Sequence, residues 1–158
     1  MSKLHKYALT TTWTGNKGDG TLTYRGFERS HTISVESKVD LLASSDPAFL
    51  GDITKHNPEE LLLASLSSCH MLWYLHLCAT AGVIVSAYED HAEGIMEETE
   101  SGSGKFIEVT LYPVVTVKDI SMKEQAIALH EKANEMCFIA NSVNFKVHHK
   151  SEVIVAEQ

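Results

Sequence analysis

A long apolar run with a well-marked start constrains the fold of this chain more than any other feature. Asn57 is a favourable N-cap, Pro58 suits the first helical position, and Glu60 follows three residues after the cap, as in a capping box. We therefore predict a helix from here to about Thr80, ended by Gly82. Because its apolar side chains cover nearly all sides, we expect this helix to be buried at the centre of the structure.

Composition and charge narrow the function classes. The apolar run from Leu61 to Ala79 is interrupted by three serines and two histidines, so we interpret it as a buried helix and not as a membrane span. The net charge of -8 over 158 residues argues against nucleic acid or an anionic membrane as a partner. The first residues carry positive charge without the apolar segment of a secretory signal. Three cysteines without framework spacing suit a reducing compartment, which we predict to be the cytoplasm.

Strand-forming residues dominate the first third of the chain. Residues 15–20 predict a turn, because three of the six are glycine. We therefore predict a hairpin of two strands, residues 6–13 and 21–35. Residues 37–56 then form a long connection of the kind that is often functional.

The rest of the chain predicts a second hairpin, a second helix and a last strand. The hairpin spans residues 83–96 and 105–117, and the last strand spans residues 143–155. An amphipathic helix is expected over residues 121–136, with Ser121 as its cap. The residues expected to face inward from it are Met122, Ile127, Leu129, Ala133 and Met136. This order of elements indicates an α+β fold with one domain over residues 1–158.

Two of the three cysteines are candidates for thiol chemistry. Cys69 lies within the long helix, beside Ser67 and Ser68, and Cys137 ends the second helix. A thiol inside a helix is most often a small core residue, which is the alternative interpretation for both. Cys78 lies about half a turn around the helix from Cys69, so we assign it to the core. His70 points about 100° away from Cys69, and we interpret it as a core histidine.

The nine histidines raise the question of a metal site. His148 and His149 are neighbours on an expected strand, so their side chains face opposite sides. His70 and His76 are not aligned on one helix face. Neither a Cys-x-x-Cys nor a His-Glu-x-x-His spacing occurs. We therefore expect no metal in the chemistry of this protein.

The run Asn57-Pro58-Glu59-Glu60-Leu61-Leu62, with Cys69 ten residues after Glu59 and Cys137 late in a second helix, resembles the OsmC/Ohr family. These are the osmotically inducible and organic hydroperoxide resistance proteins, and residues 69–76 are similar to an OsmC-like branch. The resemblance covers nearly the whole chain in element order. It implies an OsmC-like fold, with antiparallel strands around two helices, one of them long and central, in an intertwined homodimer.

The resemblance also implies roles for individual residues. Cys69 would be the peroxidatic thiolate that attacks an organic hydroperoxide, and Cys137 the resolving thiol that forms a disulfide with it. A dithiol reductant, typically dihydrolipoyl in this family, would reset the enzyme. Glu59 corresponds to the acidic residue that positions a catalytic arginine beside the reactive sulfur. No metal, flavin or haem is implied.

The chain departs from the family pattern in two places. Lys17 stands in the glycine-rich turn where the family carries its arginine, and lysine lacks the planar fork of arginine. Arg25 and Arg29 follow on the expected strand, where their spacing predicts a shared face, and we favour Arg29 over Arg25 and Lys17 as the activating cation. The alternative is that both arginines are solvated. The second departure follows Cys137, where Phe138 and Ala140 replace the usual proline and serine.

The distance between Glu59 and Cys69 carries a further expectation. Ten residues of straight helix span about 15 Å, which a carboxylate cannot bridge. Either the helix bends near residues 65–68 or Glu59 serves a thiol on another chain. The second possibility agrees with an intertwined homodimer with sites at its interface.

The leading functional hypothesis is a cysteine-based organic hydroperoxide reductase. The apolar helix around Cys69 would favour alkyl or lipid hydroperoxides over hydrogen peroxide. One alternative is a non-catalytic redox sensor or small apolar ligand-binding protein of the same fold. The other is a structural dimer with inert, buried cysteines.

Overall fold

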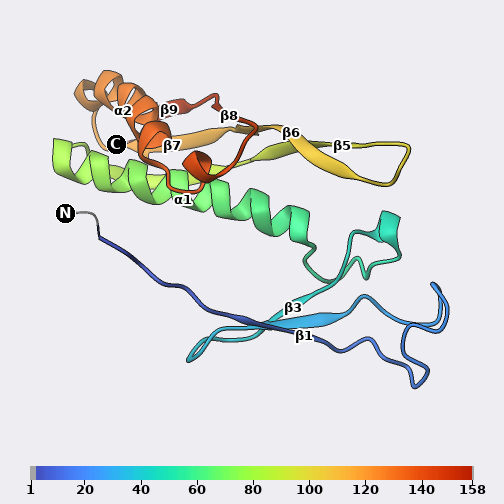
Figure 1. The fold of residues 1–158 in the computed structure, drawn as a ribbon. Coiled ribbons are helices and arrows are strands. Elements are labelled where there is room, and N and C mark those ends of the chain that lie inside the picture. Colours follow the sequence, from blue (N-terminus) through green and yellow to red (C-terminus); the bar gives the residue numbers. More distant parts are fainter. Residues whose placement is uncertain (1–2, 158) are drawn as a thin grey trace. The chain divides into compact units, whose positions relative to one another are not determined.

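The structure is a computed structural model that describes residues 3–157 (Figure 1). Within these residues it contains two α-helices and three three-stranded sheets, so the expected α+β class is confirmed. The chain divides into two compact units, one ending at Leu61 and the other beginning at Leu62.

The first unit contains one antiparallel sheet in the order β1-β2-β3. Its strands are β1 (Thr10–Trp13), β2 (His31–Ser34) and β3 (Leu41–Ala43), and the 3-10 helix η1 (Pro47–Phe49) follows. The expected hairpin is present, with Trp13 opposite His31. The connection expected over residues 37–56 is interrupted by β3 and η1.

The loop between β1 and β2 is much longer than the expected turn. Gly18 and Gly20 have φ angles of 120° and 58°, which glycine adopts without strain. The side chain of Asn16 accepts hydrogen bonds from both of their N–H groups, at 2.9 and 3.0 Å. Arg25 and Arg29 therefore lie in a loop, and the prediction that they share one face of a strand was wrong.

The long helix α1 (Pro58–Ala81) begins and ends as the sequence predicts. The Glu60 N–H donates to the Asn57 Oδ1 at 2.8 Å, and the Asn57 N–H donates to the Glu60 Oε2 at 3.2 Å. These two bonds are the reciprocal pair of a capping box. Gly82 follows the helix with a φ of 76°, in the left-handed conformation that commonly ends helices.

The second unit continues from α1 into a long bent hairpin and a second helix. The antiparallel pairs β4 with β7 and β5 with β6 confirm the expected hairpin, although each arm is interrupted once. The expected last strand is two strands, β8 parallel to β6 and β9 parallel to β7. The strand bounds are β4 (Val85–Asp90), β5 (Glu93–Glu98), β6 (Gly104–Leu111), β7 (Pro113–Val117), β8 (Lys146–His149) and β9 (Glu152–Val155).

The second helix differs in detail from the expectation. A 3-10 turn, η2 (Ile120–Met122), precedes α2 (Lys123–Met136), and a further 3-10 turn, η3 (Ala140–Ser142), follows it. Asp119, and not Ser121, caps this start, because its carboxylate accepts the Ser121 N–H at 2.8 Å. The buried side chains of α2 are Ala126, His130 and Ala133. Ile127 is 47% exposed, so its predicted inward position was wrong.

The main core lies where α1, α2 and the strands β4, β7 and β9 meet (Figure 1). Only one stripe of α1 is buried, namely Leu66, His70, Tyr74 and Cys78. Leu72 on another side is 63% exposed, so one chain does not bury α1 on all sides as expected. By length and composition α1 could cross a membrane, with a mean hydropathy of 1.3 over 18 residues, a criterion that core helices of soluble proteins also meet.

The capping box gives a direct test of the helix start. Replacing Asn57 with alanine leaves the first turn of α1 without a side-chain acceptor, and we expect the free energy of unfolding to fall by about 1 kcal/mol. Urea denaturation at one fixed protein concentration measures this. Asn57→Asp is the matched control and should stay close to the wild type, because aspartate caps helices equally well. Equal losses in the two variants would contradict the assignment of the cap.

Candidate active site

Antiparallel packing of α2 against α1 brings Cys69 and Cys137 together. The Tyr74 hydroxyl donates to the Ala126 carbonyl at 3.1 Å, and His70 and His130 are joined by a hydrogen bond of 3.1 Å. The two helices therefore run in opposite directions where these contacts are made. Beyond these contacts the Cys137 thiol lies near that of Cys69, close enough for Cys69 to raise the pKa of Cys137. The two cysteines singled out in the sequence are thus neighbours within the second unit.

The two thiols have different environments. Cys137 is the C-cap of α2 and only 1% exposed, whereas Cys69 is half-buried, and both are reduced. Burial, together with the nearby Cys69, raises the pKa of Cys137 to about 11, against the opposing effect of the Ala140 N–H at 3.4 Å. Cys137 therefore remains protonated at neutral pH, and Cys69 is the thiol that a small molecule can reach.

Cys78, the third cysteine, belongs to the core as predicted. It is 1% exposed and packs in the main cluster with Tyr74 and Val115. Burial raises the pKa of this thiol above its ordinary value. It is therefore a small apolar core residue in this structure.

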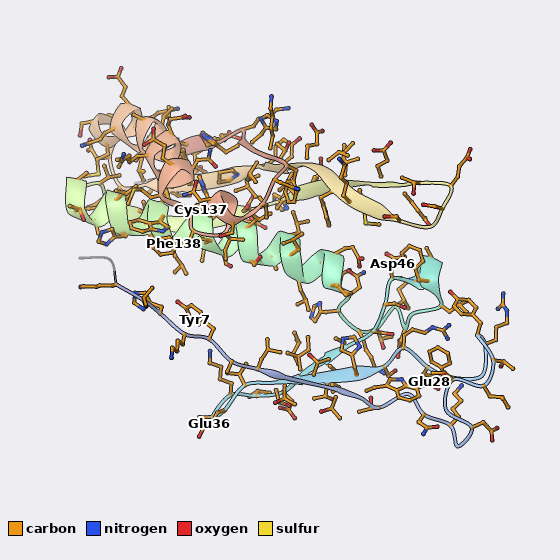
Figure 2. All side chains as sticks on the ribbon, in the orientation of Figure 1. Tyr7, Glu28, Glu36, Asp46, Cys137 and Phe138 are labelled. Carbon is orange, nitrogen blue, oxygen red and sulfur yellow. The ribbon has the colours of Figure 1, made fainter. Side chains whose placement is uncertain are left out.

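Aromatic side chains border the thiols. Phe138 follows Cys137 directly, as labelled in Figure 2, and its ring meets that of Trp73 edge-on at a centroid distance of 5.5 Å. Trp73 lies four residues after Cys69, on the same face of α1. With Leu72 and His76 it lines a shallow hollow of about 230 Å³. Phe138 and Trp73 together therefore form an apolar wall at this place.

A cluster of histidines, not predicted from the sequence, fills the space between α1 and α2. His70 and His130 are fully buried, and their rings lie 5.6 and 6.1 Å from that of His149 on β8. Tyr74 stacks on His130 at 3.8 Å. Among residues 3–157, no three side chains of His, Cys, Asp or Glu are arranged to hold a metal ion. The sequence feature that could have indicated the burial of His130 is its spacing, four residues after Ala126 and three before Ala133, which places it on the buried side of α2.

Burial keeps the central histidines neutral. It lowers the pKa of His70 to about 4, and proximity to His149 adds to this effect. Burial lowers the pKa of His130 to about 3, with contributions from His70 and His149. The sequence-based assignment of His70 to the core is correct, but it missed the histidine partner.

The candidate cations belong to the first unit. The Arg29 guanidinium donates to the carbonyls of Phe27 and Tyr24, both at 2.6 Å, and lies over both rings. Lys17, which stands where the family has arginine, forms an ion pair with Glu28 at 3.1 Å. The loop itself thus fixes the orientation of Arg29, and the role of Arg29 toward the thiol stays a prediction.

Glu59 is not used by the helix cap. The capping bonds are made by Asn57 and Glu60, so the Glu59 carboxylate is available for another partner. Its Oε2 is shielded from solvent, and no group within residues 3–157 hydrogen-bonds to it. Because α1 is continuous from Pro58 to Ala81, Glu59 and Cys69 of one chain are separated by about 15 Å along the helix.

The neutral histidines predict a pH dependence of stability. Unfolding returns His70 and His130 to an ordinary pKa near 6.5, so the unfolded chain binds more protons between pH 6.5 and about 4. As the pH is lowered from 6.5 to about 4, the free energy of unfolding should therefore decrease, by on the order of 3 kcal/mol for each histidine. Urea titrations at pH 7, 6, 5 and 4 measure this slope.

Variants separate this effect from the titration of carboxylates. The double variant His70→Gln with His130→Asn should flatten the slope, because neither amide titrates. His148→Asn is the control, since His148 lies exposed on β8 and should leave the slope unchanged. A double variant with the slope of the wild type would show that the buried histidines do not cause it.

Comparison with known proteins gives the family of the chain. A family described as OsmC-like protein matches residues 51–152, a range that includes Glu59, Cys69 and Cys137 but not Arg29. The uncharacterized protein YmaD of Bacillus subtilis is 26% identical over 155 residues, which is 96% of this chain and 95% of YmaD.

Solved structures are similar over almost the whole chain. An OsmC-like protein of unknown function from Vibrio cholerae is 32% identical, with a TM-score of 0.83 over 96% of this chain and 100% of that one. An organic hydroperoxide resistance protein from Elizabethkingia anophelis is 19% identical, with a TM-score of 0.68 over 99% and 100%, a likeness of fold alone. The expected OsmC-like fold is therefore confirmed, and the chain belongs to the OsmC-like family.

Proposed function

We propose that this protein is a cysteine-based peroxidase that reduces organic hydroperoxides to alcohols. The observation that carries the proposal is the proximity of a half-buried thiol, Cys69, to a buried thiol, Cys137. An accessible thiol beside a second thiol that can condense with its sulfenic acid is the arrangement that a two-cysteine peroxidase needs. Membership of a family that includes organic hydroperoxide resistance proteins supports the same reaction class.

The first step consumes the hydroperoxide. The Cys69 thiolate attacks the terminal oxygen of ROOH and breaks the O–O bond, so that Cys69 becomes a sulfenic acid and the substrate leaves as the alcohol ROH after protonation. The sulfur is oxidised by two electrons and the peroxide is reduced by two. The hollow lined by Leu72 and Trp73, which lie on the turn of α1 after Cys69, suits an apolar R group.

The second step uses the neighbouring thiol. The Cys137 sulfur attacks the Cys69 sulfenic acid, water leaves, and a disulfide joins the two residues. A dithiol, for which we propose a dihydrolipoyl group, then reduces the disulfide by exchange and is itself oxidised to a disulfide. Neither step needs a metal or an organic cofactor.

The thiolate of Cys69 requires a nearby positive charge. We propose Arg29 for this role, oriented by Glu59, whose shielded and unpartnered Oε2 suits a guanidinium. The bonds of Arg29 to two carbonyls leave further N–H donors free, because a guanidinium has five. Arg25 and Lys17 are the alternatives.

We further propose that the working form is an intertwined homodimer in the cytoplasm. The distance of about 15 Å along α1 prevents Glu59 from serving Cys69 of its own chain, so it serves Cys69 of the partner. The exposed apolar side of α1, represented by Leu72, gives the second chain a surface to cover. Three cysteines without framework spacing suit a reducing compartment.

Replacement of the nucleophile tests the proposed reaction. Cys69→Ser should reduce the consumption of cumene hydroperoxide with dihydrolipoamide to the background rate, because a serine hydroxyl is a poor nucleophile at neutral pH. Cys78→Ala is the matched control and should retain turnover, since this cysteine lies in the core. Unchanged turnover in Cys69→Ser would refute the proposal. A wild type that forms the disulfide but does not turn over would favour the redox sensor instead.

The activating cation has a separate test. Arg29→Lys keeps the charge but loses the fork, so we expect the rate of Cys69 alkylation by iodoacetamide at pH 7 to fall on the order of tenfold. The rate should recover at higher pH, where the thiolate forms without help. Arg25→Lys is the matched control from the same loop. A lower alkylation rate in Arg25→Lys, with an unchanged rate in Arg29→Lys, would indicate that Arg25 is the activating cation.

A further inference from the structure

Two buried polar bonds join α1 to α2, one from the Tyr74 hydroxyl to the Ala126 carbonyl and one between His70 and His130. The buried side chains of α2 before Cys137 are Ala126, His130 and Ala133. Two of these are alanines, whose single methyl groups form only shallow ridges for packing between helices. A buried hydrogen bond resists a shift of one helix along the other, because breaking it leaves polar atoms without partners.

His70 and His130 depend on one another for hydrogen bonding. The bond joins His70 Nε2 to His130 Nδ1 at 3.1 Å. Within residues 3–157, neither His70 Nδ1 nor His130 Nε2 has a partner, although both are buried. Each ring therefore has one hydrogen bond among the described residues, and a shift of either helix would remove it.

The surroundings of this bond hold both rings in place and carry few charges. Tyr74 of α1 stacks on His130, and its own hydroxyl is bonded to α2. Tyr88 of β4 packs against Tyr74 at a centroid distance of 5.9 Å. His149 of β8 stacks near both histidines and contacts Glu131 of α2 at 3.2 Å, where Glu131 is exposed.

The histidines are also closely linked to the thiols through the helices. His70 directly follows Cys69, and His130 precedes Cys137 by seven residues, or about two turns on the same face of α2. A displacement at the histidines is therefore transmitted to the sulfurs. A disulfide forms only when the Cα atoms are roughly 4.4–6.8 Å apart, so a slip of the register by a few ångströms would prevent it.

We propose that the hydrogen bond between His70 and His130, together with that of Tyr74 to Ala126, sets the register of α1 and α2 and thereby keeps Cys69 and Cys137 close enough to form a disulfide. His70 and His130 are positioning residues in this role, because they act through the backbone of the two helices. The inference rests on the proposed function in taking Cys69 and Cys137 as the working thiols.

Equilibration with glutathione tests the inference without any hydroperoxide. In this reaction the two protein thiols and oxidised glutathione give the protein disulfide and two molecules of reduced glutathione. Its equilibrium constant measures how well the folded protein presents the thiols to each other. A purely structural role would lower the free energy of unfolding and leave this constant unchanged while the protein stays folded.

Two replacements of His130 separate the hydrogen bond from the packing of the ring. His130→Phe keeps a ring against Tyr74 but removes the nitrogen, and it should lower the constant about tenfold, the factor that corresponds to one net hydrogen bond. His130→Asn places an amide atom near the position of Nδ1 and should stay within about threefold of the wild type. His148→Phe, at an exposed position on β8, is the matched control. Circular dichroism at the assay temperature establishes that each variant is folded.

The outcomes are distinct. An unchanged constant in His130→Phe would overturn the inference, as would equal losses in His130→Phe and His130→Asn, because ring packing would then be responsible. A wild type that forms no disulfide with oxidised glutathione would overturn it as well. Failure of the proposed function would give a different result. The glutathione equilibria would be as expected, but the wild type would consume no hydroperoxide.

Discussion

The antiparallel packing of α2 against one stripe of α1 is the interaction on which the candidate site depends. Cys69 and Cys137 lie 68 residues apart in sequence, and neither helix alone gives a thiol a neighbour. The contacts of Tyr74 with Ala126 and of His70 with His130 set the order in which the helices meet. The two thiols lie beyond these contacts on the same pair of helices, so the chemistry proposed for them depends on the packing of the core.

The elements that the sequence predicted well are those that depend on local interactions. Asn57, Pro58 and Glu60 mark the start of α1 within a few residues, and a capping box needs no tertiary contact to be recognised. The loop that carries Arg29 was predicted poorly, because its composition suggests strand pairing. In the structure, Gly18 and Gly20 have positive φ angles and their N–H groups bond to the Asn16 side chain instead. The sequence also did not predict that the last strand is divided into β8 and β9. This division follows from pairing with β6 and β7, which are distant in sequence.

The same distinction applies to the site. Cys69, Cys137 and Glu59 were found through a spacing that resembles a family, and the structure brings the first two together. His130 was missed because a histidine counts as polar in a periodic pattern, and only its partner His70, 60 residues away, makes its burial favourable. Phe138 was noted as a departure from the family, but its contact with Trp73 depends on where α2 ends.

The raised pKa of Cys137 has a consequence for the return half of the proposed cycle. A reductant can approach the half-exposed sulfur of Cys69 more easily than the buried sulfur of Cys137. Attack at Cys69 makes Cys137 the leaving group, and a thiol with a pKa of about 11 leaves slowly. The environment that keeps Cys137 protonated in the reduced protein would therefore slow its departure from the disulfide.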